Sequence, residues 1–121
     1  MTYCLAIVVK EGLVMASDSR TNSGVDQLNV YSKMHQLVCT ADRMLTMVSA
    51  GNLATSQAVV RRLRSDIQSN APANLNTVAT VAEAAEYIGA INFAETQKYV
   101  APGKASFIPD ASFILGGCIS G

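Results

Sequence analysis

Apolar and polar positions alternate in short blocks at the start of the chain. An apolar run over residues 3–9 turns at Lys10-Glu11-Gly12, and a second apolar run follows over 13–17. Two apolar runs joined by a short turn that contains glycine are typical of a β-hairpin. The pattern therefore predicts an antiparallel hairpin over residues 2–20.

A second hairpin is predicted over residues 33–50. Residues 34–40 form its first strand, residues 41–43 make the turn, and residues 44–50 return. The polar stretch 21–31 between the two hairpins is typical of a loop, because it is rich in turn-forming residues. Four successive strands of this kind indicate an antiparallel sheet.

The hydrophobic period changes from that of a strand to that of a helix after Gly51. A helix is predicted over residues 53–69, with Asn52 as its N-cap. The segment 70–74, which contains asparagine and proline, ends this helix. Its predicted apolar face comprises Val59, Val60, Leu63 and Ile67.

A second helix is predicted to end near Tyr99, before Pro102-Gly103. Thr80 and Glu83 fit a capping box at its start, and a start nearer Thr77 is also compatible with the pattern. An amphipathic helix places its apolar residues in one stripe. The predicted stripe comprises Val81, Ala85, Ile88 and Ile91.

Residues 111–115 are predicted to form a fifth strand that runs into Gly116-Gly117. The whole pattern is therefore two hairpins, two consecutive helices and one further strand. This order indicates an α+β fold.

Composition limits the classes of function. A chain of 121 residues, half of them hydrophobic and 15% charged, is globular and forms one domain at most. Nine basic residues balance nine acidic ones, which does not favour a nucleic acid as partner. No apolar run approaches the ~18 residues of a membrane span, and the N-terminus lacks the features of a signal peptide.

The three cysteines are odd in number and lack the spacing of metal ligands. Free thiols in a reducing cytoplasm are the simplest interpretation. Cys4 lies within an apolar strand and is interpreted as a core residue. The cysteines are Cys4, Cys39 and Cys118.

Three residues with complementary chemistry are predicted to converge at the open end of the first hairpin. Pairing about Glu11 places Thr2 opposite Ser19 or Arg20, and Asp18 then lies at the same end. Lys33 opens the next extended segment. If that strand enters from the same edge, Thr2, Asp18 and Lys33 meet at one point.

This convergence suggests a nucleophile that supplies its own base. Methionine aminopeptidases remove Met1 when the second residue is small, and Thr2 is small. The freed α-amine has an unperturbed pKa of about 7.7–8.0, so it can accept the proton of the Thr2 hydroxyl. The ammonium of Lys33 would lower the pKa of that amine, and Asp18 would hold Lys33 in place.

The alternative is that Asp18 and Lys33 form only a structural ion pair at a sheet end.

The residues that carry this chemistry also carry a resemblance. The segments 16–24 and 32–34, together with Thr2, resemble the proteasome β-subunit family of N-terminal-nucleophile (Ntn) hydrolases. Segments 1–5 and 31–35 resemble its bacterial proteasome-like branch called Anbu. The similarity continues through Ser49-Ala50-Gly51-Asn52 and residues 114–117 and covers the whole chain.

The resemblance implies the first half of a four-layer αββα sandwich. We expect residues 1–121 to be a single partial domain that is truncated on its C-terminal side. A fragment, a short gene product and one piece of a split subunit all remain open interpretations. Later serine and aspartate residues that support the nucleophile in the family would then lie outside the chain.

The resemblance also implies roles for individual residues. Thr2, Asp18, Lys33 and Gly51 are the expected catalytic residues, with the Gly51 N–H donating to the oxyanion. The glycine that turns a strand into a helix is also compatible with a purely structural role. Expected supporting residues are Ser19 and Arg20, and residues that could line a substrate pocket are Thr21, Ser49 and Leu53.

The implied activity is threonine-type peptide hydrolysis without metal or organic cofactor. Peptides or unfolded proteins are the implied substrates, and copies of the chain are expected to form a ring or an open helical stack. Whether an ATPase feeds the assembly is not determined by the resemblance. Two alternatives remain: an amidase that acts on a small substrate, and a non-catalytic structural subunit or inert fragment.

Two further groups of residues have a simpler explanation than catalysis. His35 and Cys39 are four apart on a predicted strand, so both would point to one face. A buried thiol beside a hydrogen-bonded histidine is the favoured interpretation over a nucleophilic pair. The cluster Arg61-Arg62-Leu63-Arg64 is expected to form a solvated or subunit-contact face of its helix.

Overall fold

The first hairpin forms as predicted. The computed structural model describes residues 3–22, 28–30, 32–98 and 110–120. Strand β1 (Cys4–Val9) pairs antiparallel with β2 (Gly12–Ser17), from Cys4 opposite Ser17 to Val9 opposite Gly12. The turn between them therefore consists of Lys10 and Glu11, as the apolar pattern predicted.

The segment predicted as a loop over 21–31 contains a short pair of strands, so this prediction was wrong in part. Strand β3 (Arg20–Asn22) pairs antiparallel with β4 (Leu28–Val30). A ladder is built from backbone groups, so polar residues do not prevent it. Because the stretch is polar and the ladder has only three residue pairs, the hydrophobic pattern did not predict these strands.

A three-stranded antiparallel sheet forms the centre of the fold, in the order β5-β6-β7. It consists of β5 (Met34–Cys39), β6 (Arg43–Gly51) and β7 (Ala111–Ile119). Strand β7 is longer than the predicted 111–115, because β6 offers it a pairing partner from Arg43 opposite Ile119 to Gly51 opposite Ala111. The second predicted hairpin, β5-β6, is confirmed.

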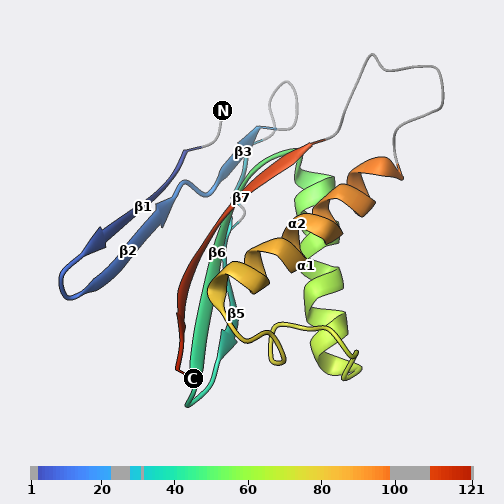
Figure 1. Ribbon diagram of the computed structural model, residues 1–121. Coiled ribbons are helices and arrows are strands. Elements are labelled where there is room, and N and C mark those ends of the chain that lie inside the picture. The colour runs from blue at the N-terminus through green and yellow to red at the C-terminus, as the bar shows by residue number, and fades with distance from the viewer. Residues whose placement is uncertain (1–2, 23–27, 31, 99–109, 121) are drawn as a thin grey trace.

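The four successive strands do not share one sheet, which corrects the simplest expectation. The β1-β2 hairpin is a separate two-stranded sheet that lies on one side of β5-β6-β7, while both helices cover the other side (Figure 1). Gly116 allows the hairpin to approach, because a Cβ there would lie 2.3 Å from Leu13 Cδ2. The chain thus has an α+β fold that matches the first half of the sandwich.

Helix α1 (Leu53–Gln68) begins at the predicted residue and ends one residue before the predicted end, with Ser69 as its C-cap. The Asn52 side chain accepts a hydrogen bond from Thr55 N at 3.0 Å and so caps the first turn. Val59 and Leu63 are fully buried, Val60 is nearly so, and Ile67 packs at the edge of the core. The predicted apolar face is therefore confirmed.

Helix α2 (Val81–Gln97) starts at the predicted capping box and not nearer Thr77. Thr80 Oγ1 accepts from Glu83 N at 3.1 Å, and Glu83 Oε2 accepts from Ala79 N at 3.0 Å. Tyr99 and Pro102-Gly103, which were predicted to end the helix, lie outside the described residues.

The buried face of α2 differs from the predicted stripe at one position, because Ala84 is buried and Ala85 is exposed. Ile88 and Ile91 are buried as predicted, and Val81 packs at the edge of the core. Glu95 is also buried on this face. Within the described ranges, neither helix is long and apolar enough to cross a lipid bilayer.

The hydrophobic core lies between the sheet and the two helices. Leu45, Met47, Val59, Leu63 and Leu75 are among its fully buried side chains. The side of the sheet that faces the hairpin is less well covered, and several hairpin side chains are more than one-third exposed. These include Ile7, Val8, Val9, Leu13 and Val14.

Candidate functional site

The strongest candidate site is an ion pair at one end of the sheets. Lys33 Nζ lies 2.8 Å from Asp18 Oδ1. Asp18 directly follows β2, and Lys33 directly precedes β5, so the pair joins the first hairpin to the central sheet. The Lys33 side chain is 8% exposed and that of Asp18 is 33% exposed, which leaves the carboxylate as the accessible partner.

The start of β1 lies beside this pair. The Asp18 backbone N–H donates to Tyr3 O at 3.0 Å and continues the register that places Cys4 opposite Ser17. Tyr3 is the first residue that the structure describes. Thr2, the predicted nucleophile, precedes it directly and lies outside the described residues, so its role stays a prediction.

The carboxylate of Asp18 is held in its charged form. The hydrogen bond from Lys33 lowers the pKa of Asp18, partial burial opposes this, and the charge of Lys33 adds to the lowering. A carboxylate with a lowered pKa is ionised at neutral pH, when a lysine is normally protonated. The pair can therefore place a fixed cation near the beginning of the chain.

Ser49 connects this corner to strand β6. It is 2% exposed, and its backbone N–H donates to Lys33 O at 2.9 Å. Cys4 Sγ donates to Ser49 O at 3.2 Å. Both residues take part in hydrogen bonds at the corner; Cys4, which the sequence placed in the core, is half-buried, and the suggested pocket role of Ser49 stays a prediction.

The strand period could have indicated the place of Cys4. Alternate residues of a strand point to the same face, so a strand predicted from residue 2 onward would have placed Cys4 and Thr2 on one predicted face. Burial raises the pKa of the Cys4 thiol, and the charge of Asp18 adds to this while Lys33 opposes it. The thiol is therefore a neutral donor at this site.

Gly51 ends β6 directly before the helix cap Asn52. Its φ is +97°, and a Cβ at this position would lie 2.8 Å from Asp110 O. The Asn52 N–H donates to that same carbonyl at 2.9 Å. The turn itself therefore requires a glycine, and the proposed donation of the Gly51 N–H to an oxyanion stays a prediction.

The other predicted site residues lie on segments near Asp18 or Gly51. Ser19 is exposed between β2 and β3, and Leu53 is the half-buried first residue of α1. Arg20 and Thr21 belong to β3, where their backbones lie opposite Val30 and Asn29. The side chains of Arg20 and Thr21 lie outside the described part of the structure.

His35 and Cys39 do not share a face, so that prediction was wrong. The ladder between β5 and β6 shifts register between Gln36 and Val38, which inserts an extra residue at Leu37. A bulge of this kind reverses the alternation of side chains beyond it. His35 is consequently buried and Cys39 is exposed, which argues against both a nucleophilic pair and a buried Cys39 thiol.

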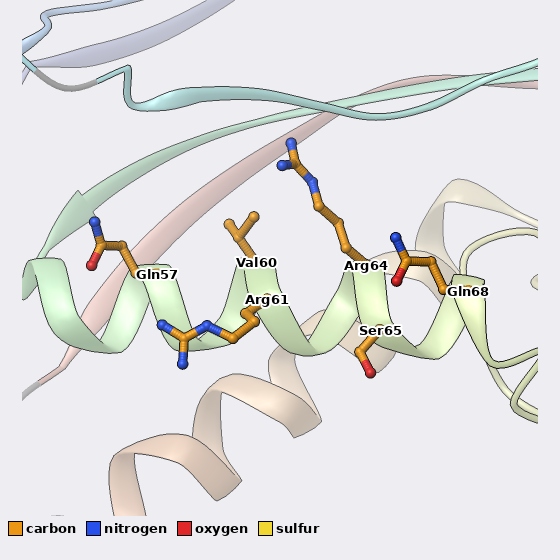
Figure 2. Close-up of a pocket in the computed structure, with 6 residues that line it drawn as sticks. All are labelled: Gln57, Val60, Arg61, Arg64, Ser65 and Gln68. Atoms are coloured by element: carbon orange, nitrogen blue, oxygen red, sulfur yellow. The ribbon is translucent and has the colours of Figure 1, made fainter.

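The arginine cluster lies on the exposed surface of α1. Figure 2 shows Arg61 and Arg64 pointing away from each other beside a shallow pocket of about 510 Å³. Arg62 pairs with Asp66 at 3.3 Å, and the Arg62 side chain is 52% exposed. This arrangement agrees with the predicted solvated or subunit-contact face.

Within the described ranges, no group of three or more histidine, cysteine, aspartate or glutamate side chains could hold a metal ion.

The chain is similar to several solved structures. It is 32% identical to a chain of the helical Anbu assembly from Pseudomonas aeruginosa, with a TM-score of 0.89. It is 34% identical to Anbu from Yersinia bercovieri (TM-score 0.86), and 31% identical to a Gly-1 mutant of Anbu from Hyphomicrobium sp. strain MC1 (TM-score 0.83). Among curated proteins, none matches the chain.

These alignments cover 98–100% of this chain but 48–49% of the other chains. The chain therefore spans about half the length of the Anbu structures it matches. The sequence profile described as "Proteasome subunit" matches residues 2–117, which is nearly all of the chain. With this match, and a fold that agrees with the first half of an Ntn-hydrolase sandwich, the chain belongs to the proteasome subunit family.

Proposed function

We propose that the chain carries the nucleophile end of a threonine-type peptidase. The observation that supports this best is the ion pair of Lys33 and Asp18, 2.8 Å apart, beside the start of β1. In an enzyme that uses its own N-terminus, a cation next to the α-amine favours the neutral amine, which is the form that can accept a proton.

The reaction begins when removal of Met1 frees the α-amine of Thr2. Thr2 Oγ1 attacks the peptide carbonyl carbon while the α-amine accepts the hydroxyl proton, directly or through water. The Gly51 N–H stabilises the resulting oxyanion. The tetrahedral intermediate then expels the amine of the leaving peptide, which takes up the proton, and an ester on Thr2 remains.

Water completes the cycle by hydrolysing this ester. The α-amine accepts a proton from the water molecule and returns it to Thr2 Oγ1 as the carboxylic acid leaves. Lys33 tunes the amine throughout, Asp18 fixes Lys33, and Ser19 and Arg20 support the loop beside them. Thr21, Ser49 and Leu53 are the proposed contacts for the substrate.

We also propose that copies of the chain assemble, since the Anbu complex of Pseudomonas aeruginosa is described as a helical assembly. A ring or an open helical stack would bring many N-termini together. The reaction requires no metal or organic cofactor, and the scheme is compatible with an ATPase partner or with none. The proposed place of action is the cytoplasm, where the free thiols would stay reduced.

Intact mass spectrometry tests the proposal. The purified protein should have lost Met1, and a peptide epoxyketone, which bridges an amine and a hydroxyl, should add once and at Thr2. Thr2→Ala should remove the adduct and leave the circular dichroism spectrum unchanged. Retention of Met1, or an adduct elsewhere, would contradict the proposal and favour a non-catalytic subunit.

A second assay separates a peptidase from a small-substrate amidase. If Thr2 forms the adduct, extended fluorogenic peptides should be hydrolysed. Labelling of Thr2 without cleavage of such peptides would favour the amidase.

A further inference from the structure

Four hydrogen bonds form a closed ring at the corner that holds the candidate site. Tyr3 O accepts from Asp18 N at 3.0 Å, and Asp18 Oδ1 accepts from Lys33 Nζ at 2.8 Å. Lys33 O accepts from Ser49 N at 2.9 Å, and Ser49 O accepts from Cys4 Sγ at 3.2 Å. Cys4 follows Tyr3 in the chain, so the ring is complete.

Two of these bonds cross between separate sheets. Among the described residues, the first hairpin and the sheet β5-β6-β7 share no ladder. At this corner they are joined by the bond from Lys33 to Asp18 and by the bond from Cys4 to Ser49. Lys33 reaches from the central sheet to the hairpin, and Cys4 reaches from the hairpin to the central sheet.

The position of Cys4 gives this second bond a specific consequence. Cys4 is two residues after Thr2 and is the first residue of β1. Two fixed links leave the corner less freedom than one, because each removes a direction in which the sheets can slide. A displacement of about 1 Å is enough to cost a catalytic site about a hundredfold in rate.

We propose that Cys4 is a positioning residue, whose thiol holds the beginning of β1 at a fixed place relative to Lys33. This inference rests on the proposed function, because the group being positioned is the α-amine of Thr2. The S–H group is a weak donor, so its contribution lies in geometry and not in the strength of the bond. Cys4 acts through its bond to Ser49 and through Lys33, and no bond of the reaction is made or broken at its thiol.

Two substitutions separate positioning from simple packing. Cys4→Ser keeps a donor, and Cys4→Val fills a similar volume without one. If Cys4 only occupies space, Cys4→Val should resemble the wild type. If the donor matters, Cys4→Ser should resemble the wild type and Cys4→Val should differ. Cys39→Val is the matched control, because Cys39 is exposed at the far end of β5.

The first measurement does not require activity. The hydrogen bond from Lys33 is the main cause that lowers the pKa of Asp18. Carbon-13 NMR titration of the Asp18 carboxyl should therefore give a higher pKa in Cys4→Val than in wild type, and an unchanged pKa in Cys4→Ser and Cys39→Val. Equal values in all four proteins would overturn the inference.

If Cys4→Val does not fold, the same titration can use the folded protein. In a Cys39→Ser, Cys118→Ser background, methylthiolation of Cys4 removes the S–H donor, and dithiothreitol restores it. The pKa of Asp18 should rise on modification and return on reduction. A pKa that stays constant through both steps would also overturn the inference.

The second measurement is the rate of epoxyketone addition to Thr2 as a function of pH. Cys4→Val should lower this rate about tenfold and shift its pH profile, whereas Cys4→Ser should stay within about threefold of wild type. If the rate of addition in Cys4→Val had the same pH profile as in the wild type, the proposal that Cys4 is a positioning residue would be wrong. If even the wild type forms no Thr2 adduct, the proposed function fails, while the Asp18 titration still decides whether Cys4 fixes the corner.

Discussion

Two cationic regions of this chain differ in how their charges are held. Lys33 is buried, touches a carboxylate at 2.8 Å and lies where two sheets meet. The arginines of α1 lie on one helix, and Arg61, Arg62 and Arg64 are all exposed. Burying a charge is costly unless it is paired, so a chain keeps such a charge where it serves a purpose.

The comparison shows why a count of basic residues is a weak guide to function. The arginine cluster is the more conspicuous feature in the sequence, yet the ion pair that the described residues show in it, between Arg62 and Asp66, is a partly exposed contact along a single helix. Such pairs contribute little free energy. Lys33 has no other charged residue next to it in the sequence. Its contact with Asp18 follows only from the way the strands are arranged.

The largest expected effect is that of Lys33→Ala on Thr2 chemistry. Removal of the cation should slow epoxyketone addition to Thr2 about a hundredfold or more at neutral pH, because the α-amine loses the charge that favours its basic form. Labelling rates from intact mass spectrometry measure this. Arg62→Ala removes an ion-paired cation from the other region and should leave the rate unchanged. Equal effects of both substitutions would abolish the distinction.

Gly51→Ala should produce the next largest effect, now on stability. A Cβ at this position would lie 2.8 Å from Asp110 O, and the backbone has a φ of +97° that a residue other than glycine rarely adopts. The free energy of unfolding of the protein should therefore fall by about 1–3 kcal/mol. Urea denaturation measures the change. Gly89→Ala on α2 is the matched control, since nothing lies within 4 Å of its Cβ and helix propensity should stabilise it by about 0.5–1 kcal/mol.

If Gly51→Ala left the free energy of unfolding unchanged, the backbone turn at residue 51 would be able to move away from Asp110 without cost, which would contradict this prediction.

A smaller effect should appear in acid. The pKa of Asp18 is lower in the folded chain than its ordinary value of about 3.9, so its ion pair stabilises the fold fully above that value. This contribution is lost as the pH falls through the lowered pKa. The stability difference between wild type and Asp18→Asn should therefore be constant above about pH 5 and shrink in stronger acid.

Urea denaturation at a series of pH values measures this difference. A difference that grew as the pH fell would reverse the inferred sign.

The smallest effect should come from Arg64→Ala. An exposed arginine usually contributes within about 0.5 kcal/mol to stability, and the rate of Thr2 labelling should not change. Burial lowers the pKa of His35 first, and the charge of Arg64 adds to this lowering. The substitution should raise the His35 pKa slightly, which proton NMR can follow because the chain has a single histidine. An unchanged His35 pKa would show that solvent screens this arginine completely.

Local patterns in the sequence predicted most of the fold. The turn at Lys10-Glu11, the caps at Asn52 and Thr80, and the hairpins β1-β2 and β5-β6 all depend on neighbours in the chain. The division into separate sheets could not be predicted, because it depends on how the hairpin packs on β6 and β7. The β3-β4 pair was missed because its three residue pairs are too short to show a period.

The sequence predicted which residues make up the candidate site, but it predicted only some of the contacts between them. The pairing of Asp18 with Lys33 agrees with the predicted convergence, since hairpin register fixes the end at which Asp18 lies. The bond from Cys4 to Ser49 was not foreseen, because it joins residues 45 positions apart in different sheets. The role of Thr2 remains a prediction that the labelling experiments test, and the role of the Gly51 N–H at the oxyanion remains a prediction.

The extra residue at Leu37 has a consequence for evolution and engineering of this chain. Lys33, His35 and Leu37 are buried at every second position, whereas Val38 is buried directly after Leu37 and Cys39 is exposed. Deleting one residue here would restore a regular pleat and turn one half of the strand over. Either Lys33 would become exposed to solvent or Cys39 would become buried. The number of residues in β5 therefore determines whether the charge of Lys33 is buried.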